Sequence, residues 1–250
     1  MNRLSVISDL HLTSMTAPSA QALLAWIDAR AKPGETIVLA GDVFDVFAGA
    51  VDVWMARYAD VFERCHRATL AGASVHWIEG NHDFHLASAL RDRAPAVHLH
   101  SDGVTIRVGK RRVRIEHGDL ADRSDYGYRA LRLAFRSPVM GLALALTPGK
   151  WMVRFGEWAS STSAGRSSRL ASDLPEEKLL RLRACYRDYA AAQAEAHSCD
   201  IVILGHCHDL DEARIKETQY LNVGFPPRHQ LAIELRSGES EWATRVPFGA

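Results

Sequence analysis

Five short motifs rich in metal-binding side chains occur in a fixed order along this chain. They are Asp9-Leu10-His11, Gly41-Asp42-Val43-Phe44-Asp45, Gly80-Asn81-His82-Asp83, His117-Gly118-Asp119 and Gly205-His206-Cys207-His208. Three of the four clearest β-strand candidates lead directly into one of these motifs. Because the ends of neighbouring strands lie side by side, the side chains that follow them can converge on one point. The motif order therefore predicts an α/β fold that holds a metal centre.

The bulk composition limits the class of protein. A length of 250 residues fits one large α/β domain or a domain with an insertion. At 47% hydrophobic residues, the chain can bury a substantial core. Lys plus Arg and Asp plus Glu number 30 each, so no overall field attracts nucleic acid. We therefore expect no nucleic-acid partner, and nothing in the sequence implies an obligate protein partner.

The cysteines and the N-terminus bear on the compartment. The four cysteines form no Cys-x-x-Cys pair, which argues against a zinc ribbon and against a disulfide framework. Free thiols are typical of an intracellular protein. The first three residues lead directly into a strand and then into Asp9, a pattern unlike a signal peptide. We expect a cytoplasmic protein.

Hydrophobic periodicity predicts alternating strands and helices in the first third of the chain. Strands are expected at 4–7, 36–39 and 75–78, and helices at 19–31, with Ser19 as N-cap, and 52–71. This alternation implies βαβ units with parallel strands. The later elements are a hairpin at 104–108 and 112–116, helices at 126–135, 141–146, 150–159 and 176–197, a loop at 160–168, and strands at 201–204, 220–223, 230–235 and 241–246.

The ligand types indicate which metals the motifs can hold. Carboxylate, amide and imidazole groups without thiolate suit Mn, Fe, Zn or Mg. A central Asp42 can bridge two ions roughly 3.5–4 Å apart, and such a pair lowers the pKa of a shared water and neutralises phosphoryl oxygens. Asn81 is informative because its neutral amide is a weak ligand whose position between Gly80 and His82 is hard to explain by packing.

With all five motifs in order between positions 9 and 208, the chain resembles the calcineurin-like metallophosphoesterases. The resemblance implies a four-layer αββα sandwich and two divalent metal ions. Mn²⁺ is the favoured metal, and Fe or Zn are the alternatives. One ion would be held by Asp9, His11, Asp42 and His208, and the other by Asp42, Asn81, His117 and His206. His82 would contact the leaving oxygen or the phosphoryl group, so that His82, Asp42 and Asn81 form the catalytic set. Asp45 and Asp83 would orient their neighbours.

A closer resemblance is to the UDP-2,3-diacylglucosamine hydrolases of lipid A biosynthesis, and it rests on residues 8–12, 41–46 and 81–84. It implies a core of residues 1–120 and 171–250 with a helical lid inserted at 121–170. It also implies cleavage of the pyrophosphate of UDP-2,3-diacylglucosamine to UMP and 2,3-diacylglucosamine 1-phosphate. The implied substrate-binding residues are Asn81, His82, Asp125, Tyr128, Arg132, Ser160 (or Ser161) and Arg169.

The lid segment carries the longest apolar stretch, 139–147. A bilayer span needs about 20 apolar residues, so this stretch is too short to cross a membrane. Basic residues lie among the apolar ones, at Arg129, Arg132, Arg136, Lys150 and Arg154. Such a composition suits an interfacial element beside anionic headgroups. We expect peripheral association with the cytoplasmic face of the inner membrane; the alternative is a lid that packs only on itself.

Two departures keep other functions open. The hydrolases usually have Arg where this chain has His82, and Arg-Pro where it has Asp209-Leu210. The generic His82 favours a second hypothesis, a metallophosphodiesterase or phosphatase that acts on a soluble nucleotide. A third hypothesis is a non-catalytic binding protein on this fold, against which the intact ligand set argues.

Overall fold

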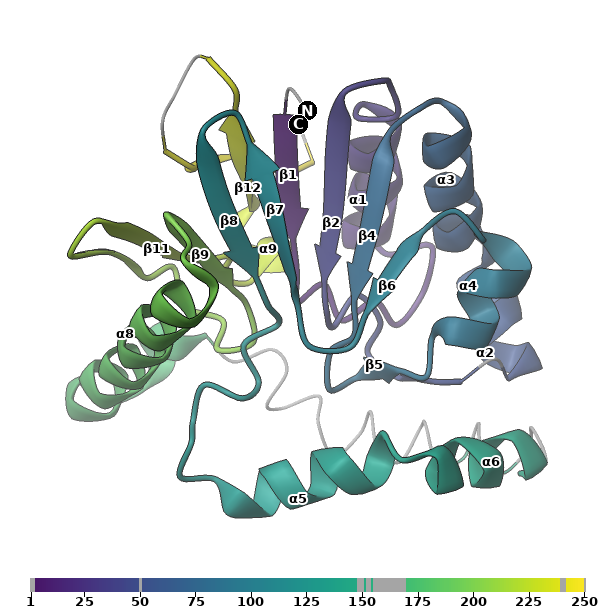
Figure 1. Ribbon diagram of the computed structural model, residues 1–250. Coiled ribbons are helices and arrows are strands. Elements are labelled where there is room, and N and C mark those ends of the chain that lie inside the picture. Colours follow the sequence, from purple (N-terminus) through teal and green to yellow (C-terminus); the bar gives the residue numbers. More distant parts are fainter. Residues whose placement is uncertain are drawn as a thin grey trace.

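The computed structural model describes residues 3–49, 51–147, 151, 154, 170–238 and 242–249. Two β-sheets pack face to face, and helices cover the outer face of each (Figure 1). The expected four-layer αββα sandwich is therefore confirmed. Three buried apolar clusters fill the three interfaces between the layers.

The first sheet has the strand order β13-β12-β1-β2-β4-β6. Its strands are β1 (Arg3–Ile7), β2 (Glu35–Ala40), β4 (Ser74–Ile78), β6 (His98–His100), β12 (Leu231–Arg236) and β13 (Thr244–Pro247). The pairs β1–β2, β2–β4 and β4–β6 are parallel, as the βαβ pattern predicts. The carboxyl ends of β1, β2 and β4 consequently share one edge of the sandwich.

The second sheet has the order β10-β11-β9-β8-β7. Its strands are β7 (Val104–Val108), β8 (Arg111–Ile115), β9 (Ile201–Leu204), β10 (Glu212–Ile215) and β11 (Thr218–Asn222). The expected hairpin forms between β7 and β8, while β8–β9 and β9–β11 are parallel. This parallel pairing brings the carboxyl ends of β8 and β9 together, although about ninety residues separate them.

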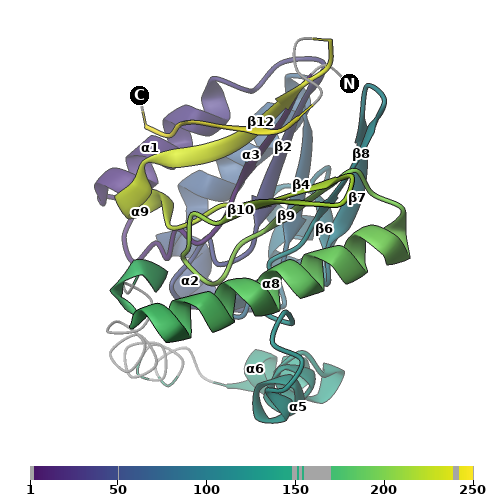
Figure 2. The same ribbon diagram turned by 90° about the vertical axis from the view of Figure 1, so that its left-hand side faces the viewer.

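The main helices cover the sheets because each has one apolar face. α1 (Pro18–Asp28) and α3 (Ala59–Leu70) pack on the first sheet, and α8 (Glu176–His197) lies along the second (Figure 2). α8 buries Tyr186 and Tyr189 against the sheet, whereas Leu179 and Leu182 are only half-buried. The shorter elements are α2 (Asp52–Arg57), α4 (Ala87–Arg93), α9 (Pro226–His229), β3 (Phe47–Ala48), β5 (Asp83–Phe84) and a 3₁₀ turn at Ala171–Asp173.

Some local predictions were wrong. The helix expected at 52–71 is broken at Tyr58, whose hydroxyl donates to the Leu12 carbonyl at 2.8 Å and whose ring stacks on Phe44. This core contact fixes Tyr58 outside helical geometry. The first helix begins one residue before the expected Ser19, because Pro18 occupies its first turn after Ala17. The helix expected at 150–159 and the loop at 160–168 lie outside the residues described, apart from 151 and 154.

The segment expected to form the lid contributes α5 (Tyr126–Phe135) and α6 (Pro138–Leu146). Both helices cross below the end of the sandwich at which β1 and β2 terminate (Figure 1). Asp125 and Ser137 cap them by accepting hydrogen bonds from Tyr128 N and Met140 N. Among the described helices, none combines the length and hydrophobicity that crossing a membrane requires.

Candidate metal centre

All seven residues predicted as metal ligands follow strands that end at this edge. Asp9 and His11 follow β1, Asp42 follows β2, and Asn81 follows β4. From the second sheet, His117 follows β8, and His206 and His208 follow β9. The two sheets therefore contribute ligand-type side chains from opposite sides of one junction.

The first cluster contains Asp9, His11 and His208. The Nε2 atoms of His11 and His208 are 3.2 Å apart, and His208 Nε2 lies 3.6 Å from Asp9 Oδ1. Phe225 stacks on the His208 ring with 4.6 Å between centroids, which fixes the plane of that ring. His11 Nδ1 is buried without a hydrogen-bond partner.

The second cluster contains Asp42, His117 and His206. His206 Nδ1 lies 3.2 Å from His117 Nε2, which is also 2.9 Å from the Asn81 amide oxygen. Asp42 Oδ2 is 3.4 Å from His117 Nε2 and 3.7 Å from His11 Nε2. Asp42 thus stands between the two clusters, where a bridging ligand belongs.

The backbone at these ligands is unusual. Five of the seven have a positive φ, namely Asp9 (55°), His11 (44°), Asp42 (52°), His206 (71°) and His208 (53°). Non-glycine residues rarely adopt this left-handed conformation, which costs on the order of 1–3 kcal/mol at each position. The packed strands on either side impose these turns, which aim the side chains across the end of the sandwich. The site is therefore preorganised by the fold.

The ionisation of the site suits bound cations. Burial would raise the pKa of Asp42, but the charges of His117 and His82 hold it well below its ordinary value. Burial would lower the pKa of His117, yet Asp42 raises it to about 10. Burial lowers the pKa of His11 to about 4, so that ring is neutral and can donate a lone pair. The buried carboxylate thus attracts positive charge, and the close imidazole nitrogens fit divalent ions in both clusters.

Neighbouring groups hold the ligands in place. The Asp83 carboxylate accepts hydrogen bonds from Asp42 N, Val43 N and Gly80 N at 2.8–2.9 Å and so joins two of the ligand loops. The ring Nδ1 of His117 donates to the Ala40 carbonyl at 3.1 Å, which leaves Nε2 for a metal. Asp83 therefore has the orienting position that the resemblance implies.

Helix α5 is fastened to the metal centre from below. The Asp119 carboxylate accepts hydrogen bonds from Tyr128 Oη at 2.6 Å and Arg132 Nε at 2.7 Å. At the end of α5, Arg136 donates to the carbonyls of Glu79 and Gly80 at 3.0 and 2.8 Å, immediately before Asn81. Helix α5 and the ligand loops are consequently connected by hydrogen bonds.

Substituting Arg136 should impair catalysis without changing metal binding. Arg136→Met is expected to lower kcat/KM for hydrolysis of a phosphodiester such as bis-p-nitrophenyl phosphate by roughly 10–100-fold. The reason is that small displacements of Asn81 and of helix α5 misplace the reacting groups. Metal content should stay unchanged. Steady-state kinetics and metal analysis provide the measurement, with Arg129→Met on the same helix as control. An unchanged kcat/KM in the Arg136 variant would show that the contact has no functional part.

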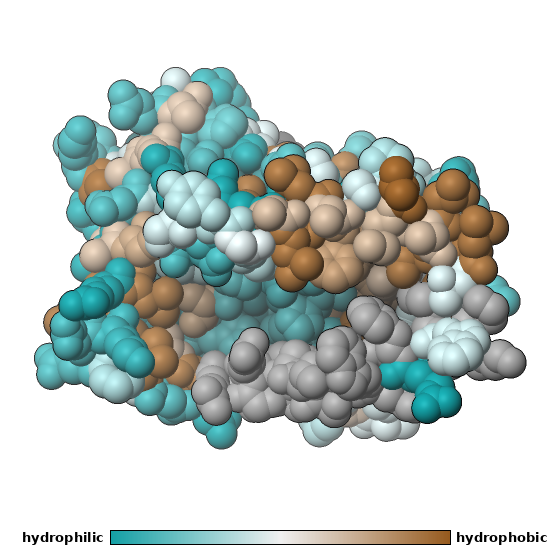
Figure 3. Space-filling view, turned by 90° about the horizontal axis from the view of Figure 1, so that it is seen from below, coloured by the Kyte–Doolittle hydropathy of each residue, from teal (hydrophilic) through white to brown (hydrophobic). Residues whose placement is uncertain are grey.

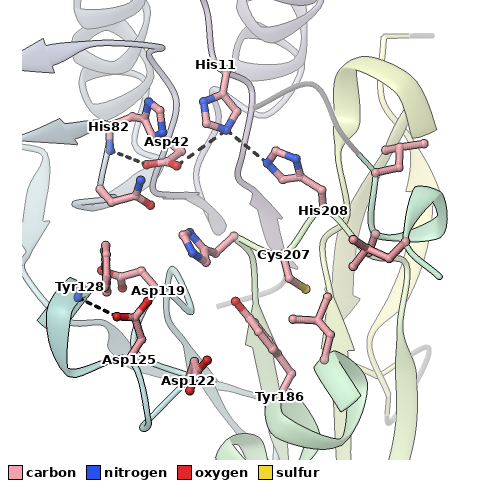
Figure 4. A pocket seen from close by; sticks show the side chains of 16 residues that line it. His11, Asp42, His82, Asp119, Asp122, Asp125, Tyr128, Tyr186, Cys207 and His208 are labelled. Carbon is pink, nitrogen blue, oxygen red and sulfur yellow. Dashed lines mark hydrogen bonds and ion pairs between the residues drawn. The ribbon is translucent and has the colours of Figure 1, made fainter. Parts of the chain in front are cut away.

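A cavity of about 680 Å³ opens in front of the two clusters. One part of its wall is polar and includes His11, Asp42, Asn81, His82, Asp119, Asp122, Asp125, Tyr128, His206 and His208. The other part is largely apolar and consists of Leu170, Ala171, Leu174, Leu182, Tyr186 and Cys207. Figure 4 shows His11, Asp42 and His82 on one side, with Tyr186 and Cys207 across from them. The cavity therefore has a polar side, which carries the ligand-type residues, and an apolar side.

The residues predicted to bind substrate are only partly assembled in the described structure. Asp125 and Tyr128 line the cavity beside Asn81 and His82. Arg132 instead faces Asp119 and Asp102, with 2.9 Å between its Nη2 and the Asp102 carboxylate. Ser160, Ser161 and Arg169 lie outside the described residues. The substrate-binding assignments stay predictions.

Three supporting residues were missed by sequence reasoning. Phe225 stacks on His208, Asn222 donates to the Gly205 carbonyl at 2.8 Å, and Arg136, directly after α5, donates to the Gly80 carbonyl of the ligand loop. Asn222 had a usable signal, because it is a polar residue at the end of an apolar strand. Phe225 and Arg136 had none, since their contacts depend on distant parts of the chain.

The sandwich and the ligand-type side chains at its edge together define the metallophosphoesterase class. The chain belongs to the Calcineurin-like phosphoesterase family, whose sequence profile matches residues 3–210.

The chain is also similar to proteins named UDP-2,3-diacylglucosamine hydrolase. The Bordetella pertussis protein is 26% identical over 238 residues, which cover 93% of this chain and 81% of that protein. The Stenotrophomonas maltophilia protein is 28% identical and covers 81% of this chain and 80% of that protein. A Pseudomonas putida protein is 30% identical, but the match spans only 54% of this chain and 55% of that protein. A solved structure described as a novel archaeal phosphodiesterase aligns over 98% of this chain and 99% of that chain, with 12% identity and a TM-score of 0.47.

Proposed function

We propose that this protein hydrolyses the pyrophosphate of a UDP-linked glycolipid of the UDP-2,3-diacylglucosamine type, releasing UMP and the acylated sugar 1-phosphate. The observation that carries the proposal is the two-part cavity, in which an apolar wall faces the candidate metal centre. A phosphate group would lie at the ligands while acyl chains contact the leucines of the opposite wall. The names of the related proteins support the same substrate.

Two divalent ions, for which Mn²⁺ is the preferred candidate, would polarise the phosphoryl group and make water nucleophilic near neutral pH. The protein's own residues orient the other participants. His82 Nδ1 is 2.7 Å from the Asp45 carbonyl, which can only accept, so Nδ1 carries a proton; a contact of Nε2 with the phosphoryl group or the leaving oxygen requires the imidazolium form, in which both nitrogens donate. The Asn81 amide sits beside His117, where it can contact both the second ion and the substrate.

The lid supports a place at a membrane surface. Hydrophobic side chains gather along α5 and α6 on the underside of the molecule (Figure 3). Leu133, Val139 and Leu146 are 73%, 78% and 75% exposed. Surface that is apolar to this extent normally contacts a partner or a lipid. We propose that it lies on the cytoplasmic face of the inner membrane, from which the substrate's acyl chains would reach the cavity.

One observation favours the alternative of a phosphodiester with a single phosphate. Among the described residues that line the cavity, none is Lys or Arg, whereas Asp119, Asp122 and Asp125 are acidic. Two ions compensate one phosphate, but the second phosphate of a pyrophosphate meets no further cation within this part of the chain. A soluble nucleotide phosphodiester is therefore the second candidate.

A comparison of kcat/KM for two substrates distinguishes the lipid hydrolase from the phosphodiesterase. With Mn²⁺ present, kcat/KM for UDP-2,3-diacylglucosamine should exceed that for bis-p-nitrophenyl phosphate at least about 10²-fold, because the apolar wall contributes binding energy only for the lipid. Leu174→Ala and Leu182→Ala should reduce lipid turnover and leave turnover of the small diester unchanged. Equal rates on both compounds, or no lipid turnover, would contradict the lipid proposal and leave the phosphodiesterase.

A further inference from the structure

Three histidines gather at the edge of the first sheet, away from the centre described above. His76 is on β4, and His98 and His100 are on the edge strand β6. His76 pairs in register with His98, and His100 follows two residues later, so all three side chains project from the same face. Asn81 lies five residues beyond His76 and three residues after the end of β4.

The contacts among these rings are close. His76 Nδ1 lies 3.0 Å from His100 Nε2. The ring centroids are 5.2 Å apart for His76 and His100, and 4.9 Å apart for His76 and His98. Two nitrogens bound to one tetrahedral zinc at 2.0–2.1 Å are roughly 3.3–3.4 Å apart, so the first pair has to open by only a few tenths of an ångström.

From this geometry we infer that His76, His98 and His100 form a further cation site, which takes one borderline divalent ion such as Zn²⁺. His76 Nδ1 and His100 Nε2 face each other and provide two ligands. His98 is exposed, and rotation of its side chain brings a third nitrogen to the ion. Water completes a tetrahedral site of the kind that three imidazoles form on zinc.

The surroundings suit this chemistry. His76 Nε2 is 3.0 Å from Ser74 Oγ, so the ring can donate its remaining proton to the hydroxyl, as metal-bound imidazoles commonly do. Burial lowers the pKa of His76 to about 4 and also lowers the pKa of His100, so both rings are neutral near neutral pH, and the proton between their facing nitrogens moves to Nδ1 of His100 when an ion binds. Arg114 is the nearby positive charge, and it is paired with Glu116 at 2.6 Å.

The bound ion would fasten a short edge strand to the sheet. β6 has only three residues and pairs with β4 alone among the described strands. Directly after it, the Ser101 carbonyl accepts hydrogen bonds from Arg132 and Arg136 of the lid helix, and Asp102 binds Arg132. An ion that joins β4 to β6 therefore also steadies the loop on which α5 rests.

The test is a calorimetric titration of the full-length Mn²⁺-loaded protein with Zn²⁺. In the wild type we expect one Zn²⁺ site per chain besides the two of the dinuclear centre, where Zn²⁺ replaces Mn²⁺. Its affinity should fall at least about tenfold in His98→Ala and in His100→Ala. His197→Ala, a histidine at the end of α8, is the matched control and should bind like the wild type. Zn²⁺ should also raise the Tm of the wild type more than that of His98→Ala.

The Asp42→Asn variant distinguishes Zn²⁺ binding at the histidine site from Zn²⁺ binding at the dinuclear centre. That variant should still bind one Zn²⁺ per chain, and this binding should disappear when His98→Ala is added. The inference is overturned if wild type and His98→Ala bind Zn²⁺ with equal stoichiometry and affinity, or if all Zn²⁺ binding is lost with Asp42→Asn alone.

Discussion

Asp42→Asn is expected to remove both metal ions and to lower hydrolysis at least about 10³-fold. Asp42 Oδ2 lies within 3.4 and 3.7 Å of histidine nitrogens in the two clusters, so one side chain serves both. The amide has nearly the same shape and can keep the hydrogen bond that Asp42 Oδ1 accepts from His82 N at 2.9 Å. The loss would consequently be caused by the missing charge. Metal analysis after gel filtration and kcat/KM on bis-p-nitrophenyl phosphate measure it.

Asp122→Asn is the matched control. Asp122 lines the same cavity but belongs to neither cluster, and its side chain is exposed. Its variant should retain both ions. If the Asp42 variant keeps two ions with near-normal activity, the bridging position assigned to Asp42 is wrong.

Alanine substitutions at two glycines should affect the two metal clusters differently. A Cβ at Gly80 would overlap Asp42 Oδ1, and a Cβ at Gly205 would overlap Asp9 Oδ2. Both glycines have backbone angles that alanine can adopt, so the effect is steric. Gly80→Ala is expected to abolish binding of both ions, because it displaces the shared carboxylate. Gly205→Ala should mainly lose the ion of the first cluster, since Asp9 belongs only there.

Metal stoichiometry measures this difference, with two ions expected in the wild type, about one in Gly205→Ala and none in Gly80→Ala. Gly127→Ala is the control, because its Cβ meets only Asp125 Oδ1, at an ordinary 3.6 Å. Activity should fall with the metal content in each variant. Equal metal loss in the two variants would mean that the clusters do not fill independently.

The sequence predicted the strands and the convergence of the ligands well, because both follow from local patterns. The apolar runs before Asp42 and Asn81 specify strands, and parallel pairing then determines that their ends meet. The break at Tyr58 and the contacts of Arg136 and Phe225 were not predictable in this way. Each of these three residues contacts a partner from another part of the chain. Tyr58 contacts Leu12, Arg136 contacts Gly80 and Phe225 contacts His208. Local periodicity carries no information about such contacts.

The first metal cluster combines residues from distant parts of the chain. Asp9 and His11 precede their partner His208, which follows β9, by almost two hundred residues. A nascent chain that stops before β9 offers each ion an incomplete set of ligands. The first cluster is therefore complete only after β9 has been translated and has paired with β8 in the second sheet.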